Sequence, residues 1–164
     1  MLIAVLSDCH DNIWNLEKAL TKLVSADIVL FCGDFCAPFT LKMLAEGFPR
    51  PIHAVLGNND GDVFLMLTVA RQVGHVTFHK PIAQLELGGK RIAVAHYPEL
   101  GEALALSGKH DAVFSGHNHT ADVQMVGSTL WGNPGEVMGR FGQPSFGMYD
   151  TATGRFEIRE ISCG

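Results

Sequence analysis

The sequence has no apolar run long enough to cross a bilayer and no excess of basic residues. Its 164 residues include 12 Lys and Arg against 17 Asp and Glu, so the net charge is −5 with histidine neutral. Because this balance provides no basic face, we expect neither nucleic-acid binding nor membrane insertion. The apolar N-terminal stretch lacks a basic flank and is too short for a signal peptide, which predicts a cytoplasmic protein.

Cysteine is also scarce, with four residues in the chain. Without a secretion signal, an even cysteine count is weak evidence for disulfides. Cys32 and Cys36 have the spacing of half a zinc site, but no second pair at ligand spacing accompanies them. We therefore expect free thiols, buried at Cys9 and Cys32, which lie in or beside apolar runs. The zinc half-site is the alternative.

Five short apolar runs each end at an Asp, Asn or His. Such runs are typical of buried strands, and open α/β sheets bind ligands beyond the carboxyl ends of their strands. Taken singly, each polar ending could be a turn residue, a helix cap or a hydrogen-bonded loop histidine. Together they predict one convergent polar site. The runs and their endings are Leu2–Leu6 with Asp8 and His10, Ile28–Cys32 with Asp34, Ile52–Leu56 with Asn58 and Asn59, Ile92–Ala95 with His96, and Ala112–Ser115 with His117 and His119.

Helical spacing follows each of the first three runs, which predicts a parallel sheet with crossover helices. The three helices are expected at Asn12–Val24, Pro38–Glu46 and Val63–Val73. Asn12 is a candidate N-cap, Pro38 suits a first helical position, and Gly47 and Gly74 are candidate stops.

The second half of the chain is expected to be mainly antiparallel, with one short helix at Leu100–Ser107. Three hairpins are predicted, the first through the turn Gly88-Gly89. We expect two sheets packed face to face with helices outside, in one domain over residues 1–164. The hairpins are Ile82–Leu87 with Arg91–Ala95, Val123–Val126 with Thr129–Trp131, and Phe146–Asp150 with Arg155–Ile161.

The motifs occur in the order D-x-H, G-D, G-N-x-D, a lone His after a strand, and G-H-x-H. This series, from Asp8 to His119, resembles the calcineurin-like metallophosphoesterases. The chain length and the segment Asn133-Pro134-Gly135 resemble the small bacterial and archaeal phosphodiesterase branch of that family. The resemblance implies an α/β fold, specifically a four-layer α/β/β/α sandwich in which helices flank two mixed β-sheets. It also implies a dinuclear metal site at the strand ends.

The resemblance also implies a role for each polar ending. The first metal would be held by Asp8, His10, Asp34 and His119, and the second by Asp34, Asn58, His96 and His117. Asp34 would thus bridge the two ions. The implied catalytic residues are Asp34, Asn58 and His96, and the implied substrate-binding residues are Asn58 and Asn59. His117 and His119 stand two positions apart, so a bend is needed for both to face the metals, and we expect Gly116 to permit it.

The implied cofactors are two divalent transition-metal ions. Imidazole, carboxylate and amide oxygen suit Mn, Fe, Zn, Co or Ni without any thiolate, and manganese is the ion expected first. Two such ions about 3.5–4 Å apart can activate a bridging hydroxide that attacks phosphorus in line. The implied substrate is a small phosphate ester.

Two positions depart from the family pattern. Asn59 stands where many members have a histidine, and Tyr97-Pro98 follows His96 where many have Gly-His. Both changes affect the leaving-group side of the chemistry. Arg140 is interpreted as a surface residue, and Trp14 and Phe35 as core or site rim. Four histidines match no motif and are interpreted as structural, namely His53, His75, His79 and His110.

Three functions are therefore weighed. The first is a metal-dependent phosphodiesterase or phosphatase. The second is a non-catalytic scaffold, because a small retromer subunit resembles the same family. The third is metal-dependent hydrolysis of an amide or ester. The complete ligand set argues against a pure scaffold, and the sequence leaves the oligomeric state open, a homo-oligomer included.

Overall fold

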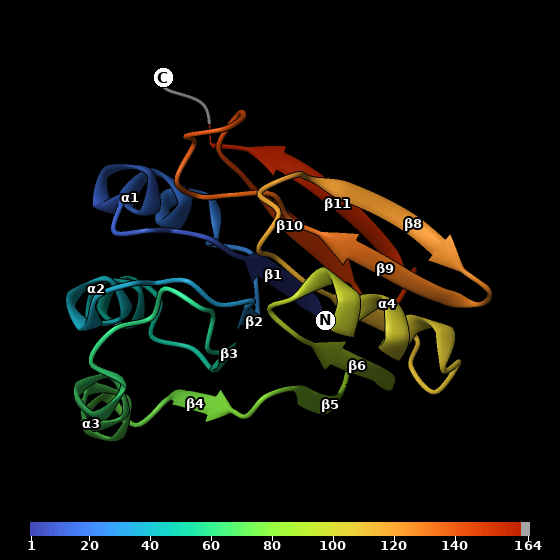
Figure 1. Ribbon diagram of the computed structural model, residues 1–164, viewed down its shortest axis with the longest axis horizontal. Helices are drawn as coiled ribbons and strands as arrows, with labels where there is room; N and C mark the ends of the chain where they lie inside the picture. Colours follow the sequence, from blue (N-terminus) through green and yellow to red (C-terminus); the bar gives the residue numbers. More distant parts are fainter. Residues whose placement is uncertain (162–164) are drawn as a thin grey trace.

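Strands and helices alternate over the first half of the chain, as the sequence predicts (Figure 1). The computed structural model describes residues 1–161. The elements of this half are β1 (Leu2–Leu6), α1 (Ile13–Lys22), β2 (Ile28–Phe31), α2 (Pro38–Gly47), β3 (Ile52–Val55), α3 (Val63–Val73) and β4 (Val76–His79). β4 is missing from the sequence-based prediction, because its four residues mix polar and apolar side chains in a run too short to stand out.

The expected signals set most of these helix ends. The side chain of Asn12 accepts a hydrogen bond from the Asn15 amide at 3.1 Å, so Asn12 caps α1. Pro38 is the first residue of α2, where its missing N–H costs nothing. Gly74 ends α3 with φ of +79°. The predicted stop at Gly47 is wrong by one residue, since α2 includes Gly47 and is capped by Phe48.

The second half contains the three predicted hairpins and a fourth helix. Its elements are β5 (Ala83–Leu87), β6 (Lys90–Val94), α4 (Pro98–Leu106), β7 (Ala112–Phe114), β8 (Asp122–Val126), β9 (Thr129–Asn133), β10 (Ser145–Asp150) and β11 (Arg155–Glu160). Gly88 and Gly89 both have positive φ, +56° and +74°, as a two-residue hairpin turn of this kind requires. α4 begins two residues earlier than predicted because Pro98 occupies its first turn.

The strands form two mixed sheets, with the orders β11-β10-β1-β2-β3-β4 and β5-β6-β7-β9-β8. The expectation of a mainly antiparallel second half is wrong for the centre of its sheet, where β6, β7 and β9 run parallel. The reason is that α4 is a crossover between β6 and β7, which makes a second strand–helix–strand unit. The hairpin β10–β11 leaves this sheet and joins the first one, with β10 antiparallel to β1.

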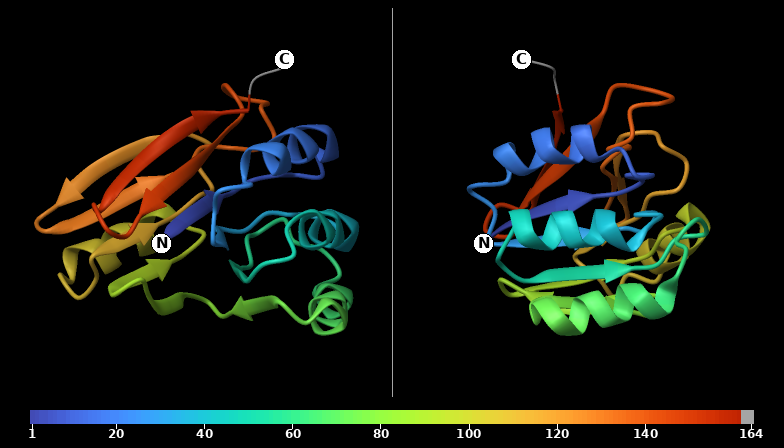
Figure 2. Two further views of the ribbon diagram at one scale, coloured as in Figure 1. Left: turned by 180° about the vertical axis from the view of Figure 1, so that it is seen from behind. Right: turned by 90° about the vertical axis from the view of Figure 1, so that its left-hand side faces the viewer.

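Three buried clusters separate four layers, which confirms the α/β/β/α sandwich (Figures 1 and 2). Side chains alternate along β1, so Ala4 and Leu6 pack toward α1–α3 while Ile3 and Val5 pack toward the second sheet. Likewise Val113 of β7 packs toward α4. Within residues 1–161, no helix is long and apolar enough to cross a membrane.

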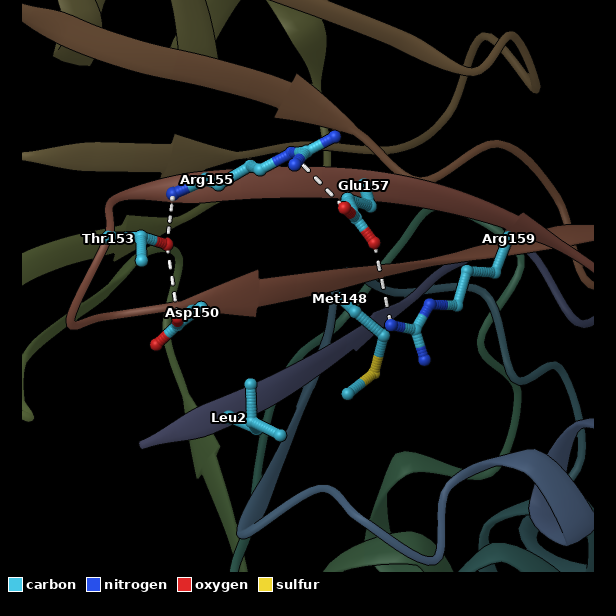
Figure 3. A pocket seen from close by; sticks show the side chains of 7 residues that line it. All are labelled: Leu2, Met148, Asp150, Thr153, Arg155, Glu157 and Arg159. Carbon is cyan, nitrogen blue, oxygen red and sulfur yellow. Dashed lines mark hydrogen bonds and ion pairs between the residues drawn. The ribbon is translucent and has the colours of Figure 1, made fainter.

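The helix-covered face of the first sheet has a hollow of about 270 Å³ over β1, β10 and β11 (Figure 3). Its charged side chains pair with one another, since Glu157 lies 3.1 Å from Arg155 and 3.5 Å from Arg159. The hollow includes Leu2, at the start of β1, whereas the predicted site follows the end of that strand. It is therefore separate from the polar strand endings.

Candidate metal centre

The polar endings of three strands, β1, β2 and β7, meet around Asp8, at the carboxyl end of β1. Asp8 Oδ1 lies 3.7 Å from His10 Nε2 and 3.6 Å from His119 Nε2. His10 Nε2 lies 3.5 Å from Asp34 Oδ2, in the loop after β2. These four residues are those that the resemblance assigns to the first metal, and the structure brings them together.

A second group lies on the other side of Asp34. His96 Nε2 lies 3.5 Å from Asp34 Oδ2 and 2.9 Å from Asn58 Oδ1. His117 Nδ1 lies 3.2 Å from His96 Nε2. The same oxygen of Asp34 is thus 3.5 Å from His10 and from His96, between the two groups. This is the placement that a bridging carboxylate requires.

Two observations show that these residues suit metal ions: the spacing of their donor atoms, and two buried polar atoms that lack hydrogen-bond partners among the described residues. Ligand atoms about 2.0–2.2 Å from one ion lie roughly 3–3.5 Å apart, close to the distances found here. Asp8 is fully buried, yet Asp8 Oδ1 and His10 Nε2 have no hydrogen-bond partner among residues 1–161. Such orphaned buried atoms are costly, and a cation between them would satisfy both. The family implies divalent ions, and the donor set fits them.

In three of the predicted ligand histidines, the nitrogen that points away from the site has a partner that orients the ring. His96 Nδ1 lies 2.8 Å from the carbonyl of Cys32, which can only accept, so Nδ1 carries the proton. His119 Nδ1 lies 2.7 Å from Glu136, and His10 Nδ1 lies 3.4 Å from the Cys36 sulfur. Protonation of the outer atom in His96 and His119 leaves each Nε2 lone pair directed into the site, as a metal-binding histidine requires. The Cys36 thiol can donate or accept, so it does not determine the His10 tautomer.

Glu136 is a functional residue that the sequence reasoning missed. Its side chain is fully buried, and its two oxygens hold different partners. Oε2 accepts from His119, while Oε1 accepts from the amides of Phe141 and Gly142 at 2.6 and 2.8 Å. The signal available in the sequence was a single glutamate directly after Asn133-Pro134-Gly135, and only the fold shows that it faces His119.

Replacing Glu136 with glutamine should weaken metal binding by about 10–100-fold, because partners behind a ligand histidine typically contribute that much. The amide oxygen can still accept from the loop amides, so the fold should survive. Metal affinity is measured by competition with a chelator of known affinity. Exposed Glu46→Gln is the matched control. Equal affinities in the two variants would contradict the role of Glu136.

Left-handed backbone brings these side chains into the site. Positive φ values of 54°, 64°, 71° and 62° occur at Asp8, Asp34, His117 and His119, a conformation that is uncommon outside glycine and gathers at functional sites. The bend that Gly116 was expected to permit therefore lies at the two histidines themselves. Gly116 is needed for space, since a Cβ there would overlap the Ser7 hydroxyl and lie 2.7 Å from Asp8 Oδ2.

Hydrogen bonds hold the site carboxylates in place. Burial raises the pKa of Asp8, but the nearby His10 ring, together with hydrogen bonds from the Ser7 hydroxyl and the His117 amide, holds that pKa below its ordinary value. Asp60 accepts from the amides of Gly57, Asp34 and Cys36 at 2.7, 3.1 and 3.0 Å, so it ties the loop after β2 to the loop after β3. This positioning role of Asp60 was also missed.

The zinc half-site is not formed. Among the described residues, Cys9, Cys32 and Cys36 are free, and the clusters able to hold a metal contain no cysteine. Burial and the carboxylate of Asp11 raise the pKa of Cys36 to about 12, which disfavours the thiolate that metals bind. Cys163 lies outside the described residues.

The remaining predicted residues lie apart from the two groups. His53 Nδ1 contacts His79 Nε2 at 2.9 Å, within the first sheet. Phe35 is fully buried, whereas Trp14 is exposed and so cannot be core. The other two unassigned histidines contact backbone carbonyls: His75 contacts that of Ala45, and His110 contacts that of Leu104 at a longer 3.4 Å. Arg140 is exposed, as predicted.

The chain is similar to known phosphoesterases over almost its whole length. Residues 1–154 match the calcineurin-like phosphoesterase superfamily domain. Phosphodiesterase MJ0936 of Methanocaldococcus jannaschii is 30% identical over 166 residues, covering 98% of both proteins. The solved structure of an archaeal phosphodiesterase has a TM-score of 0.90 at 28% identity, covering 98% of this chain and 99% of the other.

A more distant likeness concerns the fold alone. Wild-type Vps29 of Entamoeba histolytica, in complex with Zn²⁺, has a TM-score of 0.66 at 17% identity, covering 99% of this chain and all of the other. The sandwich fold, the series of strand-end motifs and the match over residues 1–154 agree with one another. On this evidence the chain belongs to the calcineurin-like phosphoesterase superfamily.

Proposed function

We propose that this protein is a metal-dependent phosphodiesterase that hydrolyses small phosphate esters, built as one domain over residues 1–164. The observation that carries the proposal is the position of Asp34 Oδ2, 3.5 Å from His10 on one side and from His96 on the other. The 30% identity to a phosphodiesterase supports the same reading. The cytoplasmic location and any homo-oligomer stay predictions of the sequence.

The chain's own residues would hold two ions and orient the substrate. The first set is Asp8, His10, Asp34 and His119, and the second is Asp34, Asn58, His96 and His117. When bound, the ions supply an activated water and Lewis acids for the phosphoryl oxygens. Manganese is our proposal, while iron, zinc, nickel and cobalt suit the same donors.

Asn58 and Asn59 are proposed as the residues that contact the substrate. Both are exposed beside Asp34. The backbone N–H of Asn59 donates to Asp34 Oδ1 at 2.8 Å, and the side-chain amide of Asn59 donates to Asp34 Oδ2 at 2.8 Å. Because Asp34 would also hold the ions, its Oδ2 would be less available to the Asn59 side chain, which could then donate to a substrate phosphate instead.

Asn59 also determines the expected leaving-group dependence. An amide cannot serve as a general acid near neutral pH, and such an acid typically supplies about 10²–10⁴-fold. The value of kcat/KM should therefore fall steeply as the leaving-group pKa rises, across aryl methyl phosphodiesters. The Asn59→His variant should show a flatter slope. A flat slope in the wild type, with chemistry rate-limiting, would show that an acid is already present.

The proposal itself is tested by hydrolysis of bis-p-nitrophenyl phosphate by metal-stripped protein after Mn²⁺ is added back, with 4-nitroacetanilide as the amide control. Turnover of the diester alone is the expected result. Turnover of the anilide instead would favour an amide hydrolase. If neither substrate reacts at full metal loading, the result would contradict the proposed activity and favour the scaffold.

A further inference from the structure

A hollow of about 320 Å³ opens beside the metal centre, on the side of His119. Its volume is at the lower end of the range for small-molecule pockets. The loops 119–121 and 141–144, the first residue of β10 and the strand β11 surround it. Its lining is His119, Thr120, Ala121, Phe141, Gly142, Gln143, Ser145, Ile158 and Glu160. A group in this hollow is therefore separated from the proposed first ion by one imidazole ring.

Phe141 forms an exposed aromatic wall of the hollow. Its ring is 5.1 Å from the His119 ring at 88°, in an edge-to-face contact, yet the side chain is 74% exposed. A phenylalanine so exposed leaves a ring face in water, and aromatic faces bind planar rings by stacking. Ala121 and Ile158 add apolar surface to the same hollow.

Hydrogen bonds to Glu136 connect the backbone at Phe141 with the proposed ligand His119. The amides of Phe141 and Gly142 donate to Glu136 Oε1, while Glu136 Oε2 accepts from His119. One buried carboxylate thus fixes the backbone that carries the Phe141 ring relative to His119. Built positions of this kind are typical of binding sites rather than of incidental exposure.

The charges of the lining restrict the kind of group that fits. Among the described residues, no lysine or arginine lines the hollow, and Glu160 is the one carboxylate in its lining. A second phosphate would find no cation in this lining, and the nearby Lys22 already donates to the Glu160 carbonyl at 3.0 Å. Thr120, Gln143 and Ser145 offer neutral hydrogen-bonding groups.

We propose that this hollow is the subsite for one organic group of the phosphodiester, and that the group is an uncharged planar aromatic ring stacked on Phe141. The inference rests on the proposed function and names its substrate class, aryl or nucleoside esters. Phe141 is then a specificity-determining residue, which contacts the organic group and not the reacting atoms.

The test is calorimetric binding to the Mn²⁺-loaded protein, so its readout is independent of turnover. Phenylphosphonate should bind about tenfold more tightly than methylphosphonate, the size of one stacking contact. In Phe141→Ala the ratio should fall to about one. The control is Phe64→Ala, which removes an even more exposed ring, on α3, and should keep the tenfold ratio.

A second pair of ligands separates the two sources of the ring. Thymidine 5′-phosphate is compared with deoxyribose 5-phosphate, and a preference for thymidine that is lost in Phe141→Ala identifies a nucleoside subsite. A preference confined to phenylphosphonate identifies a small aryl subsite. A ratio near one in the wild type, or a ratio that Phe141→Ala leaves unchanged, overturns the inference. If bis-p-nitrophenyl phosphate is still hydrolysed by the same sample, the proposed function stands without it.

Discussion

Replacing Asp34 with alanine is expected to lower phosphodiesterase activity by about 10³-fold or more. The estimate follows because two-metal stabilisation of the reacting oxygens is worth several kcal/mol, and each 1.36 kcal/mol is about tenfold in rate. Among the described residues, Asp34 is the carboxylate that reaches both ligand groups. Its Oδ2 atom lies 3.5 Å from His10 Nε2 and 3.5 Å from His96 Nε2. The measurement is kcat with bis-p-nitrophenyl phosphate, together with metal content.

The control for this variant is Asp122→Ala, which removes an exposed carboxylate on β8. It should leave both rate and metal content unchanged. Because Asp34 is buried, its variant must also be shown to be folded by circular dichroism before the rates are compared. A folded Asp34→Ala protein with the wild-type rate and metal content would contradict the proposal that Asp34 bridges the two ions.

Removing the metal should lower the melting temperature by about 10 °C. Asp8 and Asp34 are 0% and 1% exposed, so without cations two carboxylates are buried close together. A ligand present at about 1,000 times its dissociation constant stabilises the native state by ~4 kcal/mol. Each kcal/mol shifts the melting temperature of a chain this size by about 2–4 °C.

The experiment compares calorimetric melting before and after chelation, with removal verified by elemental analysis. Asp34→Ala is the internal control, because it should already melt lower and respond less to chelation. Identical melting curves for loaded and stripped wild-type protein would mean that the site is not shared between strands as described.

The sandwich could be predicted because local and long-range signals agree. Apolar runs such as Ile28–Cys32 are buried on both faces, so the strand signal is continuous and its end is clear. β4 gave no such signal, because Val76–His79 is short and partly exposed at the edge of its sheet. The parallel centre of the second sheet depends on α4 acting as a crossover, which hairpin patterns do not reveal.

The candidate site also contains residues that could be predicted from the sequence and residues that could not. Its proposed ligands could be named because each directly follows a strand and matches a motif. Glu136 and Asp60 could not be given their roles, because these depend on contacts with His119, 17 residues away, and with Asp34, 26 residues away. The left-handed backbone of His117 and His119 was also unforeseen, since glycine is the residue ordinarily expected there.

The most direct test of the dinuclear centre is anomalous diffraction from a crystal of the Mn²⁺-loaded protein. Two peaks about 3.5–4 Å apart are expected. One should lie among Asp8, His10 and His119, the other among Asn58, His96 and His117, with Asp34 between them. A single peak, or two peaks that do not share Asp34, would contradict the account.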